Sequence, residues 1–198
     1  LDDREDSDDD NDGFNDLIDF CPTQEGSATT GMKGCPDFDG DGVADAEDAF
    51  FQDETQWNDG DGDGFGDNPS GTNPDDCPLF NGNSSKDRVG CIDTDGDGYS
   101  NPQPTWTVEM GADAFVDNPN QWSDIDGDGF GDNFEDAMFD FCAEEEGTST
   151  VDRYGCPDTD GDGYSNPDPY WSVSKWDDLG YGPDMFIFDA TQWFDTDE

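Results

Sequence analysis

Histidine is absent from this sequence of 198 residues, and only 6 lysine and arginine residues stand against 54 aspartate and glutamate residues. The formal net charge of −48 excludes binding to nucleic acid and to anionic membrane surfaces, because both depend on basic residues that neutralise phosphate. Without histidine, the chain has no histidine general base, no histidine-containing catalytic triad and no histidine-ligated zinc site.

Long hydrophobic runs are also missing. Only 30% of the residues are hydrophobic, and no apolar run approaches the roughly 20 residues that span a bilayer, so we expect no direct membrane insertion. Low hydrophobicity with extreme charge is typical of a disordered acidic tail. Two features argue against that interpretation: 13% of the residues are aromatic, and the acids are phased with glycine. A chain with so small a core needs disulfides or metals for stability.

One acidic motif recurs six times in the chain, and internal repeats of this kind define the architecture. It reads Asp-x-Asp-x-Asp-Gly, then an apolar residue, any residue, and Asp or Asn. Two types alternate: the first leads to Asp-x-Cys, and the second leads to an aromatic segment and Gln-Trp. This predicts three repeats, 1–57, 58–122 and 123–198, the second and third with a Trp-bearing insertion. The motifs start at Asp8, Asp37, Asp59, Asp93, Asp124 and Asp158, and the Gln-Trp pairs are Gln56-Trp57, Gln121-Trp122 and Gln192-Trp193.

The six cysteines follow the same repeat. Six cysteines allow 15 connectivities, but identical spacing in all three repeats favours local pairing. A thiolate–metal site is disfavoured, since there is no Cys-x-x-Cys and the surrounding ligands are hard oxygens. Disulfides persist in oxidising compartments, so we expect an extracellular or cell-surface protein, and the sequon at Asn83 agrees with that location. The predicted pairs are Cys21–Cys35, Cys77–Cys91 and Cys142–Cys156.

The motif spacing suits calcium. Aspartates at positions 1, 3 and 5 of a tight turn direct carboxylates to one point, position 7 adds a backbone carbonyl, and glycine at position 6 permits the bend. Magnesium fits less well, because it keeps more of its waters. The candidate ligands at positions 1, 3, 5, 7 and 9 are Asp8, Asp10, Asp12, Phe14 and Asp16; Asp37, Asp39, Asp41, Val43 and Asp45; Asp59, Asp61, Asp63, Phe65 and Asp67; Asp93, Asp95, Asp97, Tyr99 and Asn101; Asp124, Asp126, Asp128, Phe130 and Asp132; and Asp158, Asp160, Asp162, Tyr164 and Asn166.

An acid near position 12 should close each coordination shell. Three motifs lack one at that position, and the alignment of the repeats predicts that the chain makes an excursion first and then returns its closing carboxylate. In the fifth motif Glu135 and Asp140 compete for this role. A further half-motif contributes Asp195 and Asp197. The predicted closing residues are Asp19, Asp48, Asp75, Asp113, Asp140 or Glu135, and Asp184.

Other interpretations of the motif are weaker. Asp and Gly dominate solvated turns, but six motifs in phase without cations would leave severe self-repulsion. An EF-hand requires flanking amphipathic helices, whereas these flanks hold Pro, Gly and Cys. At about five side-chain ligands per ion, the acids suit on the order of ten Ca²⁺ ions.

The segment from Cys21 to Asp48, with its Gly-Cys-Pro-Asp and its Asp-x-Asp-x-Asp-Gly-x-x-Asp-x-x-Asp motif, resembles thrombospondin type 3 repeats of the kind found in microbial surface proteins. Gly155-Cys156-Pro157-Asp158 repeats the pattern. The resemblance covers about residues 6 to 195 and implies a mostly irregular, calcium-wound and disulfide-stapled rod of tandem repeats, with little helix and only minor short β-strands. The insertions after Asn101 and Asn166 and the Gln-Trp elements depart from the family pattern.

The tryptophans fall into two groups with different expected roles. Trp57, Trp122 and Trp193 recur once per repeat, so we expect each ring to pack between repeats. Trp106 and Trp171 lie in the insertions and either pack locally or contact a carbohydrate or protein ligand.

We therefore expect a calcium-binding extracellular structural protein, a rod or fibre segment. The half-motif at the end of the sequence favours head-to-tail polymerisation with other copies of the chain. An adhesion or ligand-binding module is the alternative. Paired carboxylates hydrolyse glycosides in some enzymes, but here they are assigned to metal and no nucleophile constellation is visible, so we expect no enzyme.

Overall fold

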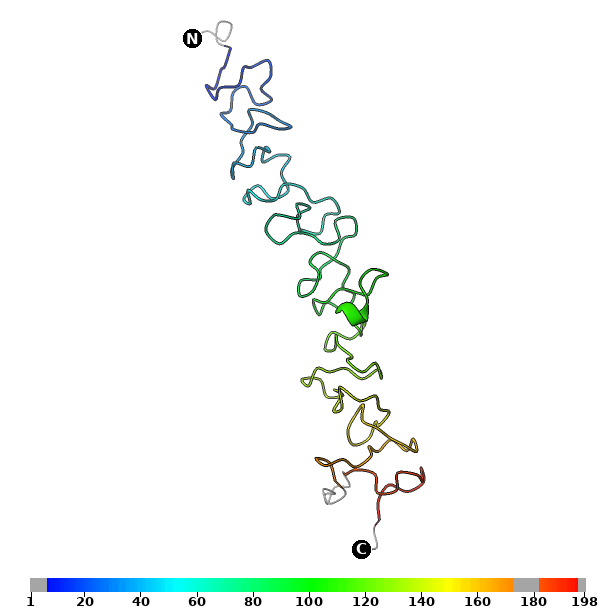
Figure 1. The fold of residues 1–198 in the computed structure, drawn as a ribbon. Coiled ribbons are helices and arrows are strands. Elements are labelled where there is room, and N and C mark those ends of the chain that lie inside the picture. The colour runs from blue at the N-terminus through cyan, green and yellow to red at the C-terminus, as the bar shows by residue number, and fades with distance from the viewer. Residues whose placement is uncertain (1–6, 173–181, 196–198) are drawn as a thin grey trace. The chain divides into compact units, whose positions relative to one another are not determined.

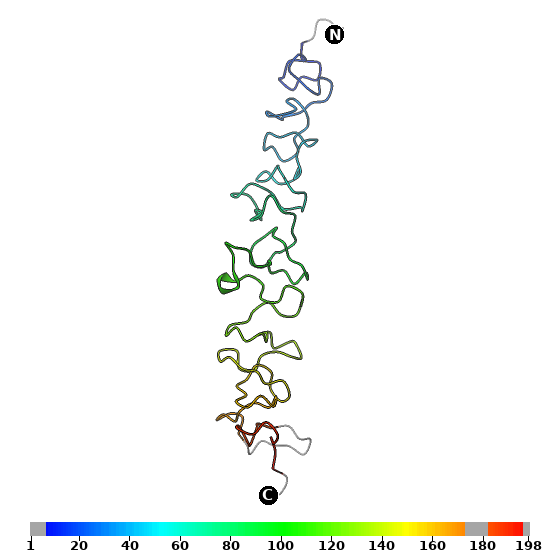
Figure 2. The ribbon, with the colours of Figure 1, turned by 90° about the vertical axis from the view of Figure 1, so that its right-hand side faces the viewer.

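A computed structural model describes residues 7–172 and 182–195. The chain divides into two compact units, Leu1–Asp93 and Thr94–Glu198. In both units the chain runs as a succession of loops that follow one another in sequence order (Figures 1 and 2). The predicted repeat boundaries after residues 57 and 122 fall inside these units, so the division into three repeats stays a prediction.

Regular secondary structure is almost absent from the described residues. It amounts to one turn of 3-10 helix, η1 (Val108–Met110), and two isolated bridges, Gly66 with Pro74 and Gln103 with Trp106. The prediction of a mostly irregular fold is therefore confirmed, with bridges in place of the short strands we expected. The three residues of η1 are far too few to cross a membrane, and the described residues contain no other helix.

Three disulfides staple the loops, with the pairing predicted from their spacing. Cys21–Cys35 and Cys77–Cys91 lie in the first unit and Cys142–Cys156 lies in the second. They indicate an oxidising environment. The apolar cores are small: in the first unit Ala28, Cys35 and Ala44 are buried together, with Met32 and Cys21 packed against them. Much of the remaining buried surface belongs to aspartate, serine and glutamine, a composition that requires hydrogen bonds or ions to satisfy it.

The Gln of the Gln-Trp pair joins one motif to the next. Gln56 is 1% exposed; its amide donates to the carbonyls of Asn68 and Thr72 at 3.1 Å each, and accepts from the Asn68 backbone N–H at 2.9 Å. In the second unit Gln121 is 3% exposed and makes the same pair of contacts with Asn133, at 3.2 and 2.8 Å. We call each of these glutamines a plug and the loop that receives it, 64–68 or 129–133, a socket.

The tryptophan beside the plug packs elsewhere. Trp122 stacks on Tyr99 with ring centroids 5.2 Å apart, and Trp193 stacks on Tyr164 at 5.3 Å, each pair within 7° of parallel. The rings of Trp122 and Trp193 therefore cover the second motif of their own repeats, while Gln56 and Gln121 make buried contacts with the following loop. The expected packing of the tryptophan rings between repeats stays a prediction.

Candidate metal centres

Each acidic motif folds into the same turn, built by its own carboxylates. In the second motif Asp37 accepts the backbone N–H groups of Gly40 at 2.8 Å and Gly42 at 3.1 Å, and Asp41 accepts that of Val43 at 2.7 Å. Gly42 has φ of +99°, which a residue with a side chain rarely adopts. The bend predicted for position 6 is therefore present.

This turn gathers carboxylate oxygens at one point. Within single motifs, three acids each offer an oxygen, and these oxygens lie within 4.8 Å of one another. Such spacing is what a cation bound by several oxygens requires. The groups that lie wholly inside one unit include Asp8, Asp10 and Asp12; Asp37, Asp39 and Asp41; Asp59, Asp61 and Asp63; and Asp124, Asp126 and Asp128.

The turns of the fourth and sixth motifs contain the same kind of local hydrogen bonds as the turn of the second motif. Asp95 accepts the N–H of Asp97 at 3.2 Å, and Asp97 accepts that of Tyr99 at 2.8 Å. In the sixth motif burial raises the pKa of Asp162, and the negative charges of Asp160 and Asp158 raise it further. The three carboxylates of that motif are therefore close enough to repel one another.

Each of these closing acids lies beside its own motif, whatever the length of the segment that separates the two in the sequence. In the third and fifth motifs the backbone N–H of the closing residue donates to the carbonyl at position 8: Asp75 to Gly66 at 2.9 Å and Asp140 to Gly131 at 2.8 Å. In the sixth motif the backbone N–H of Asp184 donates to the carbonyl of Ser165 at 2.8 Å, although a much longer insertion separates the two residues. The corresponding bonds elsewhere are Asp19 to Asn15 at 3.0 Å and Asp113 to Ser100 at 3.0 Å.

One carboxylate oxygen of each closing acid is held by the backbone. Oδ1 accepts the N–H of the residue two positions later, which is Cys77 for Asp75 and Phe186 for Asp184, both at 2.6 Å. The other four follow the same rule at 2.6 or 2.7 Å: Asp19 with Cys21, Asp48 with Phe50, Asp113 with Phe115 and Asp140 with Cys142.

The second oxygen of four closing acids is buried and has no hydrogen-bond partner among the described residues. A buried carboxylate oxygen without a donor is costly, and a bound metal ion is one partner that would satisfy it. The exposed fractions of these side chains are 9% for Asp19, 6% for Asp75, 4% for Asp140 and 1% for Asp184.

The same acids have raised pKa values. Burial raises the pKa of Asp75, Asp140 and Asp184 to about 6, and the carboxylates of the motif that each one closes add to the shift. For Asp184 these carboxylates are those of Asp162, Asp160 and Asp158. Clustered acids with raised pKa values are typical of sites that hold a cation.

The fifth motif resolves the choice between its two candidates. Burial raises the pKa of Asp140, and the charges of Asp128, Asp126 and Asp132 raise it further, whereas Glu135 is exposed. The structure therefore brings Asp140, and not Glu135, to this site.

The side chain at position 9 of the motif forms hydrogen bonds across the turn. Asp45 accepts the backbone N–H of Phe38 at 2.7 Å, and Asn166 accepts that of Thr159 at 3.2 Å while its amide donates to the Thr159 hydroxyl at 2.8 Å. This side chain shapes the turn and leaves a lone pair for a cation. The carbonyls of position 7 stay predicted ligands, as does Asp195, and Asp197 lies outside the described residues.

The disulfide loops complete the first type of site, a role that the sequence reasoning missed. Asp63 accepts the N–H of Gly82 at 3.1 Å, and Asp128 accepts that of Gly147 at 2.9 Å. A Cβ on Gly90 would lie 2.2 Å from Oδ1 of Asp75, so only glycine fits there. The signal was the glycine that precedes the second cysteine in every repeat.

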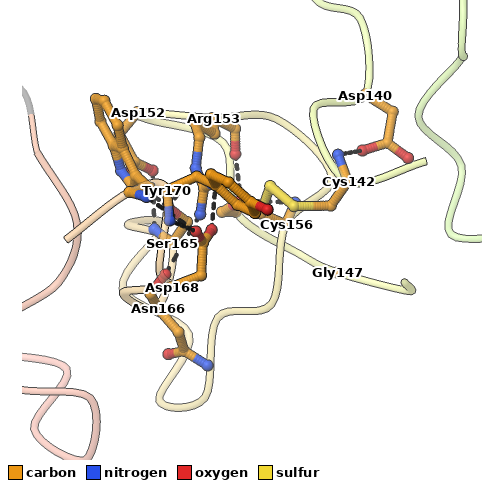
Figure 3. Close-up of a disulfide and its surroundings, with 12 residues drawn as sticks. Asp140, Cys142, Gly147, Asp152, Arg153, Cys156, Ser165, Asn166, Asp168 and Tyr170 are labelled. Carbon is orange, nitrogen blue, oxygen red and sulfur yellow. Dashed lines mark hydrogen bonds and ion pairs between the residues drawn. A yellow bond between two sulfur atoms is a disulfide. The ribbon is translucent and has the colours of Figure 1, made fainter. Parts of the chain in front are cut away.

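Arg153 and Asp152 of the disulfide loop bind the Trp-bearing insertion of the third repeat (Figure 3). We call the contacts of Arg153 with this insertion the strap. Arg153 pairs with Asp168 at 2.7 Å, donates to the Ser165 hydroxyl at 3.1 Å and lies over the Trp171 ring at 5.4 Å. Asp152 accepts the indole N–H of Trp171 at 2.9 Å. Local packing thus engages Trp171, while the neighbouring Tyr170 is 85% exposed.

The donor set fits a hard divalent cation. All six cysteines are in disulfides, so the side chains that converge are carboxylates, which suit calcium better than softer metals. No protein-family model and no curated protein matches the chain. The resemblance to thrombospondin type 3 repeats and the number of ions stay predictions.

Proposed function

We propose that this chain is a calcium-binding structural protein of the cell exterior, in which Ca²⁺ ions complete the fold. The observation that carries the proposal is the set of buried, unpartnered Oδ2 atoms on Asp19, Asp75, Asp140 and Asp184, each directed into a cluster of further carboxylates. A bound cation would remove both the unsatisfied oxygens and the repulsion within each cluster.

The role of the metal is mechanical. With small apolar cores, the loops owe their shape to turns that the carboxylates close, and the free energy of metal binding becomes free energy of folding. Each ion would bind both a motif and its closing acid, and would so hold together the two ends of the segment that lies between them. Repeats of this kind, stabilised by neighbouring contacts, suit a spacer or fibre segment.

Calcium removal tests this role. The calcium-loaded chain should be compact, and chelation should expand it through self-repulsion, which small-angle scattering and tryptophan fluorescence both detect. Calorimetric titration into the chelated protein counts the ions, and magnesium at equal concentration is the matched control. The same scattering profile with and without calcium would refute the proposal.

A ligand-binding role is the second candidate, favoured by one cavity in the second unit. Its volume is about 520 Å³, and it lies beside the stacked rings of Tyr99 and Trp122, with Val108 and Glu109 of η1 among the residues that line it. Binding to a glycan or peptide array that is lost in Val108→Ala, while calcium uptake is kept, would support this role. Tyr170→Ala, at an exposed ring outside the cavity, is the control.

A further inference from the structure

The disulfide loop of the second repeat contains a three-residue segment, Asn83-Ser84-Ser85, that is buried only at its centre. Ser84 is completely buried; its backbone N–H donates to the carbonyl of Cys91 at 3.1 Å, and its hydroxyl accepts the N–H of Cys91 at 2.9 Å. Asn83 and Ser85 on either side are exposed, as expected where successive side chains of an extended chain point to opposite faces. The buried serine thus fixes the segment and leaves its two neighbours accessible.

The side chain of Asn83 takes no part in holding the fold. Its amide makes no hydrogen bond within the part of the chain that the structure describes, whereas its backbone N–H donates to the Cys91 carbonyl at 3.0 Å. Asn68 also precedes a serine by two residues, but a proline separates them, and its amide donates to the Thr55 carbonyl at 2.8 Å. An acceptor of an N-linked glycan requires Asn-x-Ser or Asn-x-Thr in which x is not proline. Asn83 is the one asparagine of the sequence that meets this requirement.

The other two repeats contain the same segment with a different residue in place of Asn83. The residue there is Ser27 in the first repeat and Thr148 in the third, and both are exposed. Each precedes a completely buried residue, Ala28 or Ser149, whose N–H donates to the carbonyl of the second cysteine of its loop at 3.2 or 3.1 Å. The three repeats therefore share the local backbone, and the glycan acceptor is a feature of the second repeat alone.

The second repeat also exposes two large apolar side chains in this loop. Leu79 is 80% exposed and Phe80 is 62% exposed. Their backbone N–H groups donate to the Cys77 carbonyl at 2.6 and 2.9 Å, and the first repeat has the same two bonds in its loop at 2.6 and 2.8 Å. The turn is thus conserved between these repeats, but only the second repeat places apolar groups on it, and neighbouring exposed apolar groups mark a surface that a partner covers. The residues at these two positions in the other repeats are Thr23 and Gln24, and Glu144 and Glu145.

We propose that Asn83 carries an N-linked glycan and that this glycan covers Leu79 and Phe80. Three residue steps separate Asn83 from Phe80, so their Cα atoms lie at most about 11 Å apart, within reach of the first sugars of a glycan, which is bulky and solubilising. The two departures of the second repeat, an apolar pair and a glycan acceptor, then explain each other. The inference rests on the proposed location outside the cell and not on the identity of the metal.

The transfer is a substitution at the first sugar of an oligosaccharide that is linked to a polyprenyl pyrophosphate. Nδ2 of Asn83 forms a bond to the anomeric carbon, the bond between that carbon and the pyrophosphate oxygen breaks, and the polyprenyl pyrophosphate leaves with the electron pair. A base of the transferase takes the proton that Nδ2 loses, so no oxidant or reductant is needed. The exposed hydroxyl of Ser85 is the second group of the acceptor sequence that the transferase recognises.

Peptide mass mapping of the full chain, isolated from the cells that make it, tests the site. We expect most copies of the peptide that contains Asn83 to carry sugar, and the peptide that contains Asn68 to carry none. In a secreting host that performs the same transfer, Asn83→Gln and Ser85→Ala should each abolish the modification. An Asn83 peptide without sugar, or sugar that persists in both variants, would overturn the proposal. The mass does not depend on calcium, so a glycosylated chain that chelation fails to expand would refute the calcium proposal alone.

Removal of the glycan tests whether it covers the apolar pair. Enzymatic release from the folded wild-type chain in calcium should lengthen its retention on a hydrophobic interaction column, and Asn83→Gln should be retained equally long. The matched control combines Asn83→Gln with Leu79→Thr and Phe80→Gln, the residues of the first repeat, and its retention should return to that of the glycosylated chain. Enzymatic release needs no substitution, so the comparison stands even where a variant fails to fold. Equal retention of the glycosylated and the released chain would overturn the proposed cover.

Discussion

Asp140 accepts the backbone N–H of Cys142 at 2.6 Å through one carboxylate oxygen and directs the other into the fifth acidic motif. The residue that closes a candidate metal site is thus fixed by the first residue of a disulfide. The same relation joins Asp19 to Cys21 and Asp75 to Cys77, so in three places the covalent staple and the metal site share one turn of backbone.

Removal of one staple should therefore weaken a metal site as well as the fold. We expect Cys142→Ser with Cys156→Ser to lower the free energy of unfolding by roughly 3 kcal/mol, the chain-entropy value for a loop of this length, and to weaken calcium binding in addition. Denaturant unfolding in calcium and calorimetric titration measure the two effects. Calcium affinity equal to that of the wild type would mean that the disulfide acts on the unfolded chain alone.

The fifth motif offers a matched pair of acids for testing the closing role. Asp140→Asn should weaken or abolish one calcium site, because it removes the buried charge that faces Asp126 and Asp128. In calcium-free buffer the same substitution should stabilise the chain, since it relieves repulsion. Glu135→Gln removes an equal charge from an exposed side chain and should change neither. Titration calorimetry distinguishes the variants, and equal losses in both would contradict the assignment.

The sequence predicted the motif turns, the disulfide pairs and the return of Asp184 to its motif, because each is a local rule repeated along the chain. It did not predict the plugs. Gln56 and Gln121 have no apolar character and appear as surface residues in any hydrophobic pattern, so their burial depends on main-chain partners that spacing does not reveal. The alternation of Gln-Trp with Gly-Phe-Gly-Asp-Asn was the available signal. The Arg153 strap was missed for the same reason, since its partners are side chains brought together by the insertion.

Two substitutions test the plug: the first introduces a steric clash with the Gln121 side chain, and the second removes that side chain. Gly131→Ala should destabilise the chain by about 1–3 kcal/mol, the usual cost of overpacking, because the new Cβ would lie 2.2 Å from the Gln121 oxygen. Gln121→Ala alone should cost about 1–3 kcal/mol by leaving the N–H of Asn133 without its acceptor. With both changes the loss should be smaller than the sum, a coupling that denaturant unfolding in a double-mutant cycle measures. Strict additivity would show that glycine is needed there for another reason.

Acidification should stabilise the calcium-free chain. The folded-state pKa values of Asp75, Asp140 and Asp184 are raised to about 6, so the folded form binds protons more tightly than the unfolded form does. Their destabilising effect is complete above pH 6 and disappears as the pH falls toward the unfolded value near 4. Calcium affinity should fall over the same range, because protons compete for the same oxygens. Unfolding midpoints without calcium that fall steadily from pH 7 to 5 would contradict this prediction.

The strap of the third repeat should depend on the shape of the guanidinium group as well as on its charge. Arg153 donates from Nε to Ser165, from one terminal nitrogen to Asp168 and from the other to the carbonyl of Asn166 at 3.3 Å, an arrangement that a lysine ammonium cannot reproduce. We expect Arg153→Ala to cost about 1–3 kcal/mol of stability and to speed hydrogen exchange around Ser165. Arg153→Lys should restore only part of this, while Lys33→Ala, at an exposed position, removes a positive charge without a strap and should have little effect. If the lysine variant were as stable as the wild type, charge alone would hold the insertion, and the geometry seen at Ser165 and Asn166 would contribute nothing.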